Sequence, residues 1–197
     1  MKQEELDIIL ENHGKWLRNE GGERADLSNA DLKNTNLRFA NLRLADLRGA
    51  YLSYANFRGV DLRFADLKNT NLRFANLSYA NLRFADLSYA NLSNADLSNV
   101  NLSNANFRGV DLSDANLNWV NWQHVEGLTV ICVQVDTTRK NNQIAYIKEL
   151  DIWITGCFQG TLDELKASVE QTHKHNEKLK KRYYRVIDFI LNEVEEE

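Results

Sequence analysis

The chain has 197 residues, of which 43% are hydrophobic and 26% charged, and a formal net charge of −4 at pH 7. It has no Pro and only nine Gly, which argues against long linkers or disordered segments. It has neither an apolar run long enough to span a membrane nor a signal-peptide pattern, so we expect a soluble cytoplasmic protein with no membrane partner.

The N-terminal segment predicts one amphipathic helix over residues 3–18. Gly21 and Gly22 should end it. Its apolar positions are Leu6, Ile9, Leu10, His13 and Leu17. We expect residues 1–24 to form a helical cap over whatever follows, with His13 at the edge of a core rather than in a ligand site.

Residues 25–124 follow a strict five-residue rhythm. A large apolar residue recurs at every fifth position from Leu27 to Trp122, twenty times without a change of phase. A small or β-branched residue precedes it by two positions, and the residue between them is nearly always Asp or Asn. This period fits neither an α-helix nor a flat strand, and a fixed short period indicates a stacked repeat.

These units resemble the pentapeptide-repeat family, whose motif is Ala-(Asp/Asn)-Leu-X-X. Residues 25–29 read Ala-Asp-Leu-Ser-Asn and residues 85–89 read Ala-Asp-Leu-Ser-Tyr. The resemblance implies a right-handed β-helix of square cross-section with four pentapeptides per coil. The twenty units then make five coils, with the central and the small residues pointing inward.

The overall charge of the repeat is close to neutral. Residues 25–124 hold nine acidic and ten basic residues. On this count we expect no large basic field, and hence no direct binding of nucleic acid by counterion release.

Two outward columns are candidate binding sites. If one coil takes twenty residues, one side carries a possible phosphate-mimicking column, and a neighbouring corner carries exposed apolar residues beside arginines. The first set is Asp26, Asp46, Asp66 and Asp86, and the second is Leu44, Phe64, Phe84, Arg43, Arg63 and Arg83. Cations are expected to offset the repulsion among the carboxylates. They are Arg48, Lys68 and Arg108 on the same side, and Arg43, Arg63 and Arg83 on the preceding side. Exposed aromatics beside Arg are typical of protein-binding surfaces, although stacked rings could also only stiffen the column.

Residues 125–197 predict a small α+β module. Strands are expected over 128–135, 143–147 and 150–155, with a hairpin loop over 136–142 between the first two. A capping box at Thr161 and Glu164 predicts a helix from Leu162 to about His173, and a second helix should run from about Glu177 to Val194. We list Trp119, Trp122, Tyr183 and Tyr184 as the candidate docking surface, on which a homodimer could form through this module.

No motif for catalysis, a metal or a cofactor was found. Cys132, Cys157, His173 and His175 lack the short paired spacing of zinc sites. The two cysteines are expected in strands, as a reduced and buried pair. We therefore predict no catalytic residue, no metal ligand and no cofactor, and a protein that is not an enzyme.

Three hypotheses on function follow. Residues 151–153 and 157–165 are similar to the tail of short phage pentapeptide-repeat proteins, so the first is a phage-encoded inhibitor or modulator of a host DNA-handling or defence protein. The second, implied by the family, is a DNA mimic that binds gyrase or topoisomerase. The third is a structural or dimerisation scaffold.

Overall fold

The computed structural model describes residues 1–135 and 143–196. They form two compact units, Met1–Gly127 and Leu128–Glu197, and each is described here by itself. The hairpin loop expected over residues 136–142 lies outside the described residues. No helix in the described part of the chain is long and apolar enough to cross a membrane.

The repeat of the first unit is built from tight turns. The Ala30 N–H donates to the Leu27 carbonyl oxygen at 3.2 Å, and the same bond recurs along the repeat at intervals of five residues. The third residue of this first turn, Asn29, has φ of 54°. A positive φ at that place is the property of a type II turn and favours Gly or Asn.

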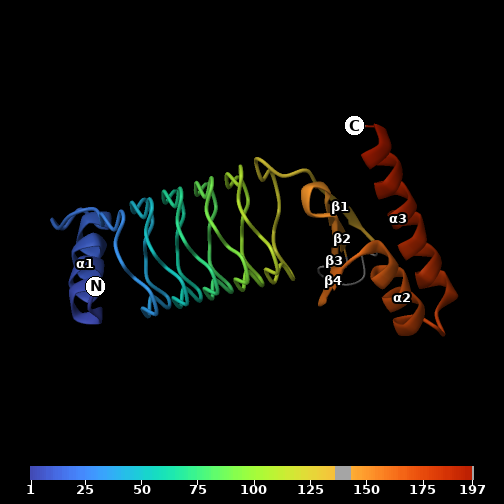
Figure 1. Ribbon diagram of the computed structural model, residues 1–197, viewed down its shortest axis with the longest axis horizontal. Coiled ribbons are helices and arrows are strands. Elements are labelled where there is room, and N and C mark those ends of the chain that lie inside the picture. Colours follow the sequence, from blue (N-terminus) through green and yellow to red (C-terminus); the bar gives the residue numbers. More distant parts are fainter. Residues whose placement is uncertain (136–142, 197) are drawn as a thin grey trace. The chain divides into compact units, whose positions relative to one another are not determined.

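Parallel bridges join one coil to the next. Asp26 pairs with Asp46, Asp46 with Asp66, and every isolated bridge joins residues twenty positions apart. A coil therefore takes four turns and has four sides, and successive coils lie next to one another (Figure 1). At the bridging position, Asp26 Oδ1 accepts a hydrogen bond from the Ser28 N–H at 3.0 Å. This local bond explains why Asp and Asn fill that place, because both stabilise turns through their side chains.

The interior of the coils is apolar. As the five-residue rhythm predicts, the central residues from Leu27 to Leu117 are at most 2% exposed. Burying each of them stabilises the fold by about 1.5–3 kcal/mol. Thr70 occupies one of the small inward positions, and its hydroxyl donates to the Leu67 carbonyl oxygen at 2.7 Å, so this buried polar group is satisfied.

Helix α1 (Gln3–Leu17) lies at the open edge of the first coil. Leu6 and His13 are fully buried. His13 Nδ1 accepts a hydrogen bond from the Ala25 N–H at 3.0 Å. Gln3 bonds both the N–H and the carbonyl of Asn36. These contacts satisfy backbone groups that have no preceding coil to pair with.

The second unit packs two helices on an antiparallel sheet. The sheet contains β1 (Val130–Gln134), β2 (Gln143–Ile147), β3 (Ile152–Thr155) and β4 (Phe158–Gly160), in the order β1-β2-β3-β4, and the short 3-10 helix η1 (Lys148–Leu150) joins β2 to β3. Helix α2 (Leu162–Thr172) and helix α3 (Glu177–Glu196) follow. The shared core includes Trp153, Leu165 and Ile187.

Several details of the C-terminal prediction need correction. The first strand is shorter than expected, and β4 was not predicted, because three residues around a Gly give almost no strand signal. The capping box is confirmed: the Thr161 side chain accepts from the Glu164 N–H, and the Glu164 side chain accepts from the Thr161 N–H. The second unit begins at Leu128 rather than at residue 125, because Glu126 still bridges to Asn106 in the preceding coil.

Candidate protein-binding surface

The corners of the coils carry large side chains in an unfavourable backbone conformation. Phe64 and Phe84 both have φ of 59°, and Leu44 has φ of 62°. This left-handed region costs an L-residue about 1–2 kcal/mol, whereas Gly and Asn adopt it readily. Asn104, in the same column, shows that an Asn fits this place. The backbone conformation alone would therefore favour Asn or Gly where this chain has Phe and Leu.

The predicted apolar column is exposed. Leu44 is 37%, Phe64 51% and Phe84 43% exposed. The rings of Phe64 and Phe84 stack with centroids 4.9 Å apart and planes 3° from parallel. Together with Arg43, Arg63 and Arg83 they form what we call the Arg–aromatic ridge.

The ridge arginines do not all have the partners that the sequence suggested. Arg63 pairs with Asp61, two residues earlier on its own side, through its Nε at 2.8 Å from Oδ1. Arg83 lies over the ring of Phe84, 5.4 Å from its centroid. The predicted column of Asp26, Asp46, Asp66 and Asp86 is called the Asp column below. Among the described residues, none of the three ridge arginines pairs with it. The part of the expectation that concerns these three arginines is therefore wrong, because Arg63 pairs with Asp61 and Arg83 lies over the Phe84 ring.

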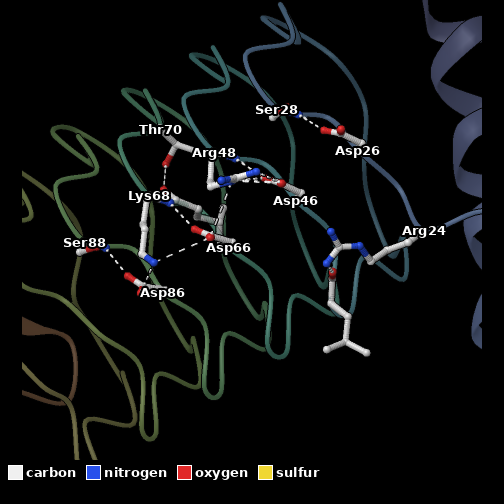
Figure 2. Close-up of polar contacts among 12 residues, drawn as sticks. Arg24, Asp26, Ser28, Asp46, Arg48, Asp66, Lys68, Thr70, Asp86 and Ser88 are labelled. Atoms are coloured by element: carbon white, nitrogen blue, oxygen red, sulfur yellow. Dashed lines mark hydrogen bonds and ion pairs between the residues drawn. The ribbon is translucent and has the colours of Figure 1, made fainter.

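As predicted, cations on its own side lie between the carboxylates of the Asp column. Figure 2 shows Arg48 between Asp46 and Asp66, and Lys68 between Asp66 and Asp86. The Lys68 Nζ is 3.1 Å from Asp86 and 3.8 Å from Asp66. The hydrogen bond from the Arg48 side chain holds the pKa of Asp46 below its usual range, against the opposing effect of burial.

Two other corners also carry exposed rings, which the sequence analysis did not single out as site residues. Tyr54 stacks on Phe74 at 4.9 Å. The guanidinium of Arg58 lies 4.5 Å from the Tyr79 centroid, and the Phe39 ring covers Gly59. All four rings lie two residues after a central residue, and the twenty-residue spacing by itself places Tyr54 with Phe74 and Phe39 with Tyr79.

The residues expected to form a docking surface are divided between the two units. Trp122 is 5% exposed and packs edge-on against Phe107 at 6.4 Å. Tyr183 is 7% exposed and belongs to the core of the second unit. The prediction that these two residues present an exposed surface is wrong. Trp119 is 37% exposed, and the hydroxyl of Tyr184 donates to Glu170 at 2.9 Å.

No candidate metal site is found in the described part of the chain. In residues 1–135 and 143–196, no group of three or more His, Cys, Asp or Glu side chains could hold a metal ion. Cys132 lies in β1, but Cys157 lies in the turn between β3 and β4. Both thiols are free and exposed, so the expectation of a buried pair in strands is wrong.

Solved structures resemble the repeat of this chain. A pentapeptide repeat protein from the Arabidopsis thaliana thylakoid lumen is 31% identical with a TM-score of 0.50, over 50% of this chain and 69% of that protein. The pentapeptide repeat protein Rfr23 from the cyanobacterium Cyanothece 51142 is 25% identical with a TM-score of 0.45, over 59% and 97%. QnrB1, a plasmid-mediated fluoroquinolone resistance protein, is 20% identical with a TM-score of 0.32, over 52% and 65%. The last two TM-scores are too low to support an argument about function.

A search of curated proteins finds no match to this chain. The comparison with protein families finds pentapeptide repeats, in eight copies, over residues 25–63, 55–88, 65–104 and 90–121. These matches all lie within the coils described above. The chain therefore belongs to the pentapeptide-repeat family, whose members fold as right-handed quadrilateral β-helices.

Proposed function

We propose that this protein is a non-enzymatic binding protein whose rigid repeat presents the Arg–aromatic ridge to a protein partner. The observation that carries the proposal is the set of exposed Leu and Phe side chains held at positive φ. Backbone strain of this kind persists where function requires it. Aromatic residues and Arg are also the residue types enriched at protein interfaces.

The repeat is well suited to hold such a surface in place. Each coil is hydrogen-bonded to the next through backbone groups, and its inward residues are buried. The backbone that carries the ridge is thus fixed before any partner arrives, which lowers the entropy cost of association.

The test compares two double variants in affinity capture from a bacterial lysate. Phe64→Asn/Phe84→Asn changes the ridge, while Tyr51→Asn/Tyr89→Asn removes two exposed rings outside it. Asn occupies equivalent places elsewhere in the repeat, so both variants should fold. We expect a partner captured by the natural protein to be lost only with the ridge variant. A partner retained equally by all three proteins, or no partner at all, would overturn the proposal.

The alternative of a DNA mimic depends on the Asp column. Its four carboxylates span three coil spacings, about 14 Å. B-DNA of that length carries about eight charges, whereas the column together with Arg48 and Lys68 has a net charge of only −2. This low charge density favours the ridge as the binding surface. A gyrase supercoiling assay with the natural protein and an Asp66→Asn/Asp86→Asn variant tests this alternative. A DNA mimic should inhibit or protect gyrase, and the variant should lose that effect.

The remaining expectations stay predictions. They are a phage origin, a host DNA-handling or defence protein as the partner, a cytoplasmic location, and a homodimer formed through the C-terminal module. Size-exclusion chromatography with light scattering tests the last of these directly.

A further inference from the structure

The near-neutral charge of the repeat hides a separation of charge between its sides. The basic strip, as we call residues 33–44, 53–64 and 73–84, covers two consecutive sides of neighbouring coils. It holds seven basic residues and one acidic residue. The remaining sides of the same coils, residues 25–32, 45–52, 65–72 and 85–92, hold two basic and five acidic residues. The twenty-residue coil produces this separation, because it stacks Arg on Arg and Asp on Asp.

Most arginines of the strip have no carboxylate partner. Among the described residues, only Arg63 of the six makes an ion pair, with Asp61. Arg38, Arg73 and Arg83 are exposed and lie against neighbouring rings. Guanidinium groups in this state can bind carboxylates in pairs of parallel hydrogen bonds without first breaking an internal ion pair.

Stacking covers one face of each ring in two pairs of the strip. Phe64 and Phe84 cover each other at 3° between planes, and Tyr54 and Phe74 do so at 5°. The face of a ring is its negative region and the edge its positive region. Ring edges therefore suit negatively charged groups. Rings already stacked on one another are poorly placed to receive nucleic-acid bases, whose binding depends on free ring faces.

We infer that the basic strip binds an acidic segment of a protein partner, with Arg43 and Arg83 meeting its carboxylates and the ring edges between them. This inference rests on the proposed function and adds the chemistry of the partner. Neighbouring coils are about 4.8 Å apart, close to the 5.4 Å pitch of an α-helix. An acidic helix lying along the column can place one carboxylate near each successive coil.

The probe for the test is a fluorescein-labelled helical peptide with Glu at every third or fourth position. Its controls are the same peptide with Gln in place of Glu, and a labelled oligothymidylate. Fluorescence anisotropy is measured with the natural protein, with Arg43→Gln/Arg83→Gln, and with Lys68→Gln/Arg108→Gln. The last variant removes the same charge from outside the strip.

We expect the Glu peptide to bind and the Gln peptide not to bind. The Arg43→Gln/Arg83→Gln variant should bind the Glu peptide about fivefold more weakly, because it lacks two surface charge contacts. The Lys68→Gln/Arg108→Gln variant should keep its affinity, and binding should weaken between 50 and 200 mM salt. Tighter binding of oligothymidylate than of the Glu peptide, equal losses in both variants, or no binding overturns the inference. A captured partner that still depends on Phe64 and Phe84 would then leave the proposed function intact.

Discussion

The double substitution Phe64→Asn/Phe84→Asn should change the free energy of unfolding only slightly, although it removes two Phe side chains. Each ring is about half exposed, so each loses about half of the 1.5–3 kcal/mol that full burial provides, or about 1.5–3 kcal/mol for both. Losing the stacked pair costs about 0.5–1.5 kcal/mol more. Relief of the left-handed strain returns about 1–2 kcal/mol at each position. The net destabilisation should therefore stay below about 2.5 kcal/mol.

The comparison is with Leu62→Ala, in the same turn as Phe64. Leu62 is 0% exposed, and replacing a fully buried Leu by Ala costs about 2.7–5 kcal/mol. Urea denaturation followed by circular dichroism gives the transition midpoint of each variant. The midpoint of the double variant should lie at a higher urea concentration than that of Leu62→Ala. If the double variant unfolds at a lower urea concentration than Leu62→Ala, the two rings mainly stabilise the fold, and the argument from backbone strain fails.

Two further predictions concern the N-terminal cap and the corners. Burial lowers the pKa of His13, so the unfolded chain binds a proton more readily. Stability should be complete above the ordinary His pKa of about 6.5 and fall as the pH drops below it. His13→Asn keeps an acceptor for the Ala25 N–H but cannot titrate there, so its melting temperature should fall less than the natural protein's between pH 7.5 and 5.5. Equal falls would rule out this role for His13. Gly59→Ala should destabilise the protein more than Gly21→Ala. Both positions have positive φ. A Cβ at Gly59 would lie 2.7 Å from the Phe39 ring, whereas a Cβ at Gly21 would have no atom within 4 Å. Thermal denaturation of both variants measures the difference, and equal losses would show that the ring contact contributes nothing.

The period of the repeat was predictable because each unit specifies its own turn. The bond from the Ala30 N–H to Leu27 and the bond from the Ser28 N–H to Asp26 both lie within a few residues. Local bonds of this kind can be read from a motif. The N-terminal helix and the two C-terminal helices were predictable for the same reason, since apolar spacing and a capping box are local signals.

The candidate site was only partly predictable. The column containing Phe64 and Phe84 follows from counting in twenties, and its exposure was expected from the fold that the resemblance implies. The partners of Arg63 could not be assigned from the sequence, because a long side chain at a corner can turn toward either adjacent side. The burial of Trp122 follows from its place as the last central residue of the repeat, whereas that of Tyr183 depends on contacts within the second unit.

By itself, the sequence determined that the chain winds through pentapeptide turns around a leucine core, because that information repeats every five residues. Only the tertiary structure decided where charge gathers. A count over residues 25–124 gives near neutrality, whereas the coil brings residues twenty positions apart into one column and so separates a basic strip from an acidic side. Electrostatic fields depend on distance in space, and that distance becomes known only when the coil is closed.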